Sequence, residues 1–342
     1  MRFLITGGAG FIGSNTTRAL LDQGHEVVVF DNLSRAGSDA NLAWLKQGGG
    51  ELVTVKGDVR ERDALEAALQ QHGPFDVVLH FAAQVAVTTS VLDPALDFEI
   101  NAKGTFNVLE AVRHADPSPI LLYASTNKVY GGLEGYEIEE AETRYEFAET
   151  ERGVPEFAPL DFHSPYGCSK GAADQYVRDY HRIYGLRTIV FRNSCIYGPR
   201  QFGIEDQGWL AWFVIAAVQG KDITIFGDGK QVRDVLYIDD LVDAMVAAVE
   251  NIETTQGQVY NMGGGPENSL SVWAEFGPML EELEGSSIPV QFEDWRPGDQ
   301  RVYISDISKA QRDFGWTPQT SPEQGVRQLY EWVRENQDLV AS

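Results

Sequence analysis

The first forty residues constrain the fold of this chain more than any other stretch. A short apolar segment at 2–6 leads into a glycine-rich turn at 7–13, a helical pattern follows, and a second apolar segment at 27–30 ends at Asp31. A dinucleotide-binding unit consists of a strand, a glycine-rich turn, a helix, a second strand and an acidic residue, in this order. We therefore expect the chain to begin with such a unit.

The turn has the spacing G-x-x-G-x-x-G, a variant of the usual fingerprint. Gly7 permits the sharp turn, Gly10 lets the backbone approach a pyrophosphate at the helix N-terminus, and Gly13 lets the helix pack closely on the sheet. Asp31 is expected to accept from the ribose hydroxyls and to repel a 2′-phosphate, so NAD is expected rather than NADP. The residues expected to contact NAD on this unit are Gly7, Gly10, Phe11, Ile12, Asp31 and Asn32.

Strand-like apolar segments continue to alternate with helical patterns along most of the chain. The alternation predicts a doubly wound parallel sheet, and therefore an α/β fold of the Rossmann type. Ligands bind such sheets at the carboxyl ends of the strands. The strands are expected at 2–6, 27–30, 52–56, 77–81, 120–125, 187–192 and 259–262.

The alternation breaks near residue 196, where the sequence becomes rich in aromatic residues and glycine. We expect an NAD-binding domain at 1–195 and a smaller, C-terminal substrate domain at 196–234 and 263–342. The segment 235–262 is expected to return to the first domain, with an amphipathic helix at 236–249 that leads into the last strand.

Charge and cysteine content exclude several classes of function. The chain has 51 acidic and 27 basic residues, a formal net charge of -24, which repels nucleic acid and anionic membranes. Its two cysteines, Cys168 and Cys195, have neither metal-ligand spacing nor the pattern of a disulfide framework. The first strand begins directly after Met1, leaving no room for a signal peptide, and no apolar run is long enough to cross a membrane. A cytoplasmic protein is expected.

A possible catalytic pair lies on a helix predicted to begin at Ser164-Pro165 and to end at Gly185. Tyr166 and Lys170 are four residues apart and therefore share one face of this helix. The lysine ammonium and the helix N-terminus both favour a phenolate, so we expect a lowered pKa and a general base or acid at Tyr166. Alone, this spacing is more typical of two surface residues.

A second chemical element follows the fifth strand, in the segment 123–131. There the hydroxyl of Thr126 could hydrogen-bond a substrate oxygen and share its proton with Tyr166. Without Tyr166, a structural Ser/Thr turn would be the better interpretation.

These residues, together with other short blocks, resemble the extended short-chain dehydrogenase/reductases of the nucleotide-sugar epimerase and dehydratase group. The resemblance implies that Thr126, Tyr166 and Lys170 are catalytic, that Lys170 also holds the nicotinamide ribose, and that Asp58 and Val59 contact adenine. Further residues that it places at the cofactor are Ala82, Ala83 and Asn101. It rests on residues 6–13, 31, 57–59, 80–83, 101–105, 125–131, 166–170, 197–199, 233–235 with 239–240, and 296–299.

Two details of the resemblance narrow the reaction. The dehydratases of the group need an acidic pair directly after the strand-end hydroxyl, and this chain has Asn127 and Lys128 there, so dehydration is not expected. The blocks 125–131, 163–171 and 193–209 resemble 2-epimerases of CDP-linked deoxysugars, which oxidise the sugar transiently with bound NAD and return the hydride to the opposite face.

Two alternatives stay open. A UDP-glucose 4-epimerase, or a related UDP-sugar epimerase, would share the same catalytic residues and differ in how the sugar is held. A non-catalytic NAD-sensing protein on the same fold should have lost Tyr166 or Lys170, and both are present.

The substrate anchors are expected in the C-terminal part. Arg233 and Arg296 are the expected diphosphate clamps, because guanidinium groups match phosphate oxygens, and Asn193 is expected to donate to a phosphate. For Arg200, a solvated surface charge is an equally good interpretation. The substrate-binding residues expected are Thr126, Asn127, Asn193, Arg200, Gln201, Arg233, Arg296 and Asp299.

Two further expectations concern surfaces. The acidic insertion at 132–161 could be a lid over the sugar or a solvated loop, and we favour the loop. The resemblance also implies a homodimer or homotetramer that pairs through two long helices, one of which carries Tyr166.

Overall fold

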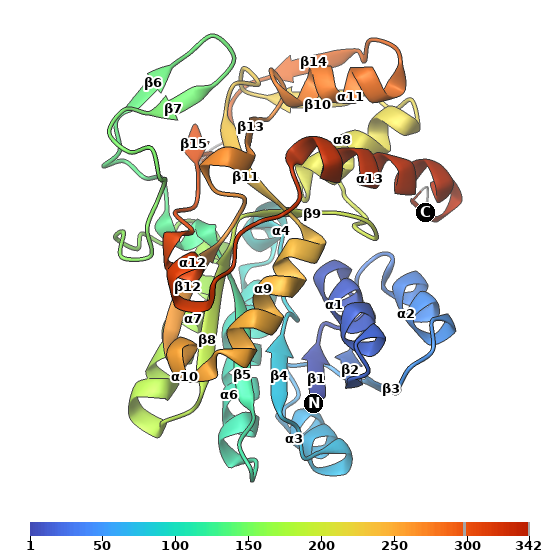
Figure 1. Cartoon of the computed structure of the whole chain (residues 1–342), viewed down its shortest axis with the longest axis vertical. Helices are drawn as coiled ribbons and strands as arrows, with labels where there is room; N and C mark the ends of the chain where they lie inside the picture. Colours follow the sequence, from blue (N-terminus) through green and yellow to red (C-terminus); the bar gives the residue numbers. More distant parts are fainter. Residues whose placement is uncertain (297–298, 341–342) are drawn as a thin grey trace.

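The fold is built on a seven-stranded parallel sheet, which occupies the lower half of Figure 1. The computed structural model describes residues 1–296 and 299–340. The strand order β12-β8-β5-β4-β1-β2-β3 reverses at β1, as in a doubly wound fold, and the predicted α/β class is confirmed. The strands are β1 (Arg2–Thr6), β2 (Glu26–Asp31), β3 (Leu52–Lys56), β4 (Val77–His80), β5 (Ile120–Thr126), β8 (Thr188–Asn193) and β12 (Gln258–Met262).

Helices cover both faces of this sheet. Because side chains alternate along a strand, Phe3 and Ile5 of β1 belong to one core cluster and Leu4 belongs to the other. The helices α1 (Phe11–Asp22) and α9 (Ile238–Glu250) pack on the first face. The helices of the second face are α3 (Arg62–His72), α6 (Gly104–His114) and α7 (Ser164–Tyr184).

Smaller helices extend these layers. The helix α2 (Ser38–Gln47) packs against α1, and a group of short helices packs against α7. That group consists of α4 (Val87–Leu92), α5 (Pro94–Phe98) and the π-helix η1 (Glu99–Lys103), while α10 (Ile252–Thr255) follows α9. No helix of the described part of the chain is long and apolar enough to cross a membrane.

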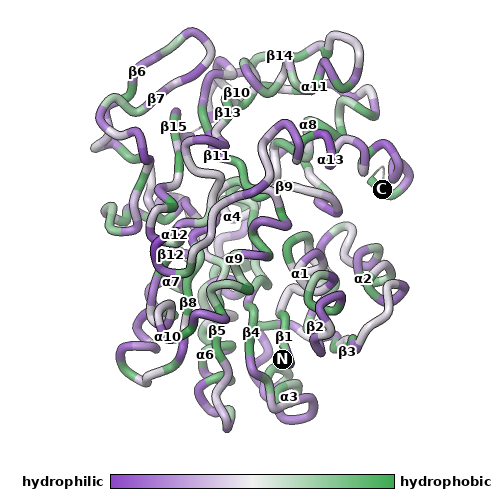
Figure 2. Tube along the Cα trace, viewed as in Figure 1, coloured by the Kyte–Doolittle hydropathy of each residue, from purple (hydrophilic) through white to green (hydrophobic). Residues whose placement is uncertain are grey.

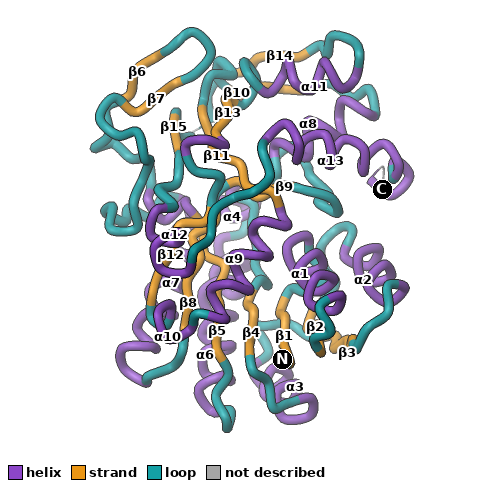
Figure 3. Tube along the Cα trace, in the orientation of Figure 1, coloured by secondary structure: helices purple, strands orange, loops and turns teal. Residues whose placement is uncertain are grey.

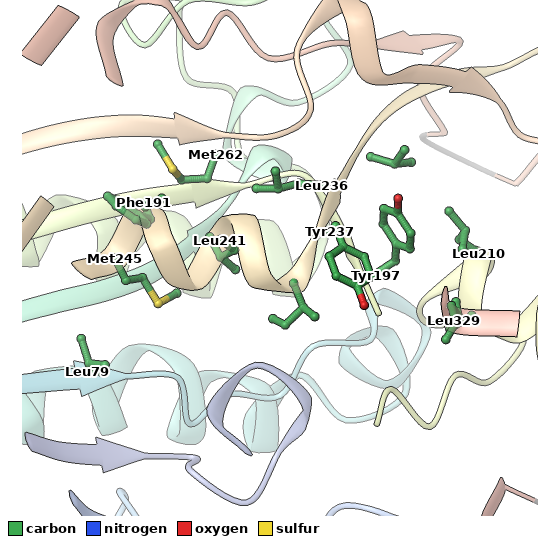
Figure 4. Close-up of a cluster of buried hydrophobic side chains, with 14 of the residues drawn as sticks. Leu79, Phe191, Tyr197, Leu210, Leu236, Tyr237, Leu241, Met245, Met262 and Leu329 are labelled. Atoms are coloured by element: carbon green, nitrogen blue, oxygen red, sulfur yellow. The ribbon is translucent and has the colours of Figure 1, made fainter. Parts of the chain in front are cut away.

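The central strands are mostly apolar, and β1, β4, β5 and β8 are largely green in Figure 2. Such continuous apolar runs are expected where helices cover both faces of a parallel sheet. The core extends from this sheet through α9 into the second lobe of the molecule. In Figure 4 the rings of Tyr197 and Tyr237 lie between Leu241 of α9 and Leu210 of the second lobe, and the two ring centroids are 5.6 Å apart.

The second lobe, in the upper half of Figure 1, consists of short strands and helices joined by long loops (Figure 3). Its strands are β9 (Cys195–Tyr197), β10 (Ile223–Phe226), β11 (Val232–Tyr237), β13 (Ser269–Ser271), β14 (Val290–Glu293) and β15 (Val302–Tyr303). Its helices are α8 (Trp209–Val218), η3 (Pro266–Asn268), α11 (Phe276–Glu284), α13 (Pro322–Glu335) and α14 (Gln337–Val340). The helix α12 (Ser308–Phe314) packs instead on β12 of the main sheet.

The helix predicted at 236–249 begins two residues later than expected, at Ile238. Leu236 and Tyr237 belong instead to β11, where they pair with Ile196 and Tyr197 of β9. The division of the chain into two domains at the predicted boundaries stays a prediction.

The insertion at 132–161 is mostly exposed to solvent, as we favoured, but it is not an irregular loop. It contains a hairpin of β6 (Ile138–Glu140) and β7 (Tyr145–Phe147), preceded by the short 3-10 helix η2 (Asn127–Tyr130). Arg144 pairs with Glu275 of the second lobe at 2.6 Å, and the buried Tyr145 donates its hydroxyl to Asp228 at 2.5 Å. The hairpin therefore braces the second lobe.

Candidate active site

A cavity of about 450 Å³ lies at the carboxyl ends of the parallel strands. It is lined by the glycine-rich turn, by the ends of β2, β4 and β5, by the first turns of α7, and by the segments 193–197 and 206–210. No described residue of the insertion at 132–161 lines it, which also argues against a lid. The predicted catalytic and cofactor-binding segments thus meet at one edge of the sheet.

The glycine-rich turn forms a cradle that only glycine permits. Gly7 has φ +71°, and a Cβ there would lie 2.6 Å from the backbone nitrogen of Ala82. A Cβ on Gly13 would lie 2.1 Å from the carbonyl oxygen of Gly7. Gly10 caps the N-terminus of α1 without a side chain, so the free N–H groups of the first turn face the cavity. This geometry fits a pyrophosphate at a helix N-terminus.

The acid that ends β2 is fixed at the cavity wall. The carboxylate of Asp31 accepts hydrogen bonds from the backbone N–H groups of Ala9, at 3.0 Å, and of Leu33, at 2.8 Å. Burial raises the pKa of Asp31, and these two backbone donors oppose the shift. Oriented in this way beside the glycine cradle, Asp31 fits the ribose of a dinucleotide.

The predicted adenine-side residues line the same end of the cavity. The amide of Asn32 donates to Asp58 at 2.9 Å, and Arg60 binds the same carboxylate at 2.7 Å, which lowers the pKa of Asp58 to about 2. Asp58 is therefore a fixed carboxylate. Further predicted residues that line the cavity are Phe11, Ile12, Val59, Ala82 and Ala83.

Local structure places Tyr166 on the cavity wall. The hydroxyl of Ser164 accepts from the backbone N–H of Gly167 at 3.2 Å, which confirms the predicted cap, and α7 ends at Gly185 in the left-handed conformation. The backbone N–H of Tyr166 donates to Ser90 of α4 at 3.1 Å. The first turn of α7 is thus held both by its own cap and by a neighbouring helix.

The expected lowering of the Tyr166 pKa is wrong. Burial raises this pKa to about 12, a hydrogen bond from Thr126 opposes the rise, and Asp97 adds to it. The loss of solvent around the phenol is the largest of these effects. Tyr166 therefore carries its proton at neutral pH.

Lys170 lies one turn further along α7 and reaches the end of β5. Its Nζ donates to the carbonyl oxygen of Ala124 at 2.6 Å and lies 4.4 Å from the centre of the Tyr123 ring. Burial lowers the pKa of Lys170 to about 7, and Asp174 and Asp97 oppose this. The lysine is therefore close to losing its charge at neutral pH.

Thr126, at the end of β5, completes the catalytic group. Its Oγ1 accepts from the backbone N–H of Lys128 at 3.2 Å and donates to Asn127 at 3.3 Å. Thr126, Tyr166 and Lys170 all line the cavity, although they come from segments forty residues apart in the sequence. A hydroxyl, a phenol and an ammonium at one point can bind and deprotonate a substrate hydroxyl.

Asn101 lies behind the cavity wall, and its position does not support direct contact with a cofactor. Its amide donates to the carbonyl oxygen of Gln84 at 2.9 Å, to Asp97 at 3.1 Å and to Ser169 at 3.2 Å. Asn101 belongs to the π-helix η1, and Ser169 belongs to α7. Asn101 therefore ties α7 to the loop after β4.

The predicted substrate-binding residues divide into two sets. Asn127, Asn193 and Gln201 line the cavity together with Thr126. The Oδ1 atom of Asn193 is buried without a hydrogen-bond partner within the described residues, so it is available to a ligand. Buried acceptors are usually satisfied, which makes this atom a candidate contact.

The predicted arginines lie outside the cavity wall and already have partners. Arg233 is buried and pairs with Asp299 at 2.7 Å, so two predicted residues meet each other. Arg296 pairs with Asp206, a residue of the cavity wall, at 3.1 Å. Both arginines would have to exchange or share a carboxylate in order to bind a phosphate.

Arg200 lies away from the catalytic group. Its guanidinium carbon is 3.9 Å from the centre of the Trp44 ring, and its Nη1 is 3.4 Å from Asn41, both residues of α2. Burial lowers the pKa of Arg200 to about 10. These contacts indicate that Arg200 links the second lobe to α2.

Sequence reasoning missed several residues of the cavity. Arg35 lines it and donates to Gln207, and Lys128 and Trp209 also line it. Lys128 could have been found from its position two residues after Thr126. We used that position only to argue that the acidic pair of a dehydratase is missing. Trp209 begins the apolar helix α8, whose composition gives no sign of a binding role.

Comparisons with known proteins agree with this geometry. Residues 3–263 match the NAD dependent epimerase/dehydratase family. The chain is 46% identical to the CDP-paratose 2-epimerase of Salmonella typhi, over 97% of this chain and 99% of the relative. Among solved structures, it resembles the UDP-glucose 4-epimerase of Thermotoga maritima with UDP-glucose, with a TM-score of 0.82 and 30% identity over 98% of this chain and 100% of that one.

A second solved structure contains both a nucleotide sugar and NAD. It is the UDP-glucuronic acid 4-epimerase of Bacillus cereus in complex with UDP-glucuronic acid and NAD. The TM-score is 0.83 and the identity is 30%, with 98% of this chain and 99% of that chain covered.

Proposed function

This chain belongs to the NAD dependent epimerase/dehydratase family, and from that membership we propose that it inverts C2 of a CDP-linked deoxysugar, converting CDP-paratose to CDP-tyvelose. It is an NAD-dependent enzyme. The observation that carries the proposal is that Thr126, Tyr166 and Lys170 line the same cavity as the glycine cradle. The 46% identity to a CDP-paratose 2-epimerase supports the choice of substrate and carbon.

The roles of the protein groups follow from their positions. Thr126 orients the reacting sugar hydroxyl, and Tyr166 accepts its proton and later returns it. Lys170, held on the carbonyl of Ala124, supplies positive charge beside the phenol and a donor for the nicotinamide ribose. NAD, when bound, supplies the hydride acceptor and a positively charged ring that favours the phenolate.

Inversion requires that the oxidised sugar turn over inside the cavity. A ketone carbon is flat, so hydride that returns to its other face gives the epimer. We infer that the nucleotide is held firmly and the sugar loosely. Asn193 and Gln201 are the proposed contacts within the cavity, and Arg233 and Arg296 are the proposed diphosphate ligands after they release or share their carboxylates.

We also propose that the enzyme is a homodimer or homotetramer. Large apolar side chains are exposed on adjoining helices of one face, among them Leu92 at 86%, Phe98 at 56% and Tyr176 at 53%. The rings of Phe106 on α6 and Tyr176 on α7 are 6.2 Å apart, so these two exposed side chains adjoin each other. An apolar surface of this kind favours burial against a second copy. Light scattering after size exclusion tests this, and a monomer at micromolar concentration would contradict it.

The substrate is tested by following the sugar protons by NMR. The enzyme is incubated with CDP-paratose and, separately, with UDP-glucose, in both cases without added NAD. Inversion at C2 of the CDP-sugar is the expected result. Turnover of UDP-glucose at C4, with CDP-paratose unchanged, would refute the 2-epimerase and leave a UDP-sugar 4-epimerase with the same catalytic residues.

A further inference from the structure

Lys128 is a cation of the cavity to which the roles above assign no function. It lies in η2, two residues after Thr126, and its backbone N–H donates to the Thr126 hydroxyl at 3.2 Å. Its side chain lines the cavity and is half-buried. Its Nζ has no hydrogen bond or ion pair with any described residue.

The surroundings of Lys128 leave its charge uncompensated. The neighbouring charged groups are Arg233 and Asp299, which pair with each other at 2.7 Å and so neutralise one another. Burial and Arg233 lower the pKa of Lys128, while Asp299 and Cys195 raise it. A partly buried ammonium without a partner is costly, and an anionic ligand would remove that cost.

The proposed substrate carries its anionic group next to C1 of the sugar. The phosphate on C1 is therefore close to C2 and lies across the ring from C4. In an enzyme that oxidises C2, this phosphate must lie beside the residues that touch the reacting hydroxyl. Lys128 fits such a position, because its backbone contacts Thr126 directly and both residues line the cavity.

We propose that Lys128 binds the sugar-linked phosphate of the substrate, and that this contact places C2, and not C4, opposite Tyr166. The inference rests on the proposed function and deepens it. Lys128 becomes a specificity residue, whereas Arg233 and Arg296 bind the rest of the diphosphate. Its ammonium can donate hydrogen bonds to the phosphate without first releasing a carboxylate, as Arg233 and Arg296 would have to do.

The phosphate contact is tested by calorimetric titration of the NAD-loaded enzyme with CMP and CDP, and with UMP and UDP. The ratio of the Kd values for monophosphate and diphosphate measures how much the terminal phosphate contributes. In K128M and K128Q we expect this ratio to fall by about ten- to a hundredfold, the contribution of a charge-assisted hydrogen bond. K128R should keep most of it. K103M, which removes a surface lysine, should leave it unchanged.

The possible outcomes test the phosphate contact, the CDP-sugar function and the selection of C2 separately. An unchanged ratio in both K128M and K128Q, with retained NAD and an unchanged melting temperature, would overturn the phosphate contact. If the ratio of the Kd values for UMP and UDP falls in the Lys128 variants while the wild type leaves CDP-paratose unchanged, the result supports the contact of Lys128 with the phosphate. It also refutes the proposed CDP-sugar function. For CDP-paratose, kcat/KM of K128M should fall by the same factor as the ratio. Reaction of the wild type at C4 would overturn the role of Lys128 in selecting C2.

Discussion

Replacing Lys170 by methionine should make the enzyme inactive but more stable in mildly acidic solution. In the folded protein, burial lowers the pKa of Lys170 to about 7 from its ordinary value of 10.5. A cation whose pKa falls on folding destabilises the folded state fully below the folded value, and the cost disappears as the pH rises toward the ordinary value. At about 1.36 kcal/mol per pKa unit, the cost at pH 6 is about 5 kcal/mol, and at pH 9 it is about 2 kcal/mol.

The measurable quantity is the change with pH in the stability difference between K170M and the wild type. Loss of the hydrogen bond to Ala124 costs about 1 kcal/mol, but this does not depend on pH and cancels. We expect K170M to gain about 3 kcal/mol more at pH 6 than at pH 9. With a urea dependence of about 3 kcal/mol per molar, this is a relative midpoint shift of about 1 M.

The assay is urea unfolding of the protein freed of NAD, followed by circular dichroism at both pH values. K103M is the matched control, because Lys103 lies on the surface beside Glu99, and its difference from the wild type should not change with pH. A K170M difference that is equally independent of pH would refute the reasoning. It would mean that Lys170 keeps its ordinary pKa in the folded protein.

Three further predictions concern catalysis, cofactor choice and the core. Tyr166→Phe should lower kcat by about 10²–10⁴-fold with unchanged circular dichroism, and a smaller loss would exclude a general base there. Asp31→Ser should weaken NAD binding and raise the affinity for NADP, because it removes a carboxylate that two backbone donors hold in place. Both affinities are measured by calorimetry, and an unchanged ratio between them would contradict the prediction. Asp174→Asn should lower the free energy of unfolding by about 3–5 kcal/mol, because it leaves the fully buried Arg192 without its ion partner. Glu99→Gln, which removes an ion pair on the surface, should lower it by at most about 1 kcal/mol. Equal losses in the two variants would refute the argument from burial.

The main sheet could be predicted because its central strands are buried on both faces. Such strands are continuous apolar runs, so the predicted and observed ends differ by at most one residue. The glycine-rich turn was also predictable, since the clash of a Cβ on Gly7 or Gly13 with nearby backbone is a local requirement. The proximity of Thr126 to Tyr166 and Lys170 could be predicted from the rule that ligands bind at the carboxyl ends of the strands.

The second lobe was harder to predict because distant contacts decide its structure. The hairpin of the insertion is held by Glu275 and Asp228, which lie at least eighty residues further along the chain. Arg200 was placed among the substrate residues by its neighbours in the sequence, yet it packs on Trp44, more than 150 residues earlier. No local pattern in the sequence encodes either pairing.

The error at Tyr166 has a more general cause. The sequence shows that Lys170 is one helical turn away, and from this spacing alone a lower pKa of the phenol follows. It does not show how much solvent the fold removes from each group, and here burial raises the pKa of Tyr166 and lowers that of Lys170. Both shifts favour the uncharged form of the side chain, so the fold opposes a charge on either member of the pair. The sequence therefore shows which groups can meet, whereas the fold decides how much solvent each of them loses.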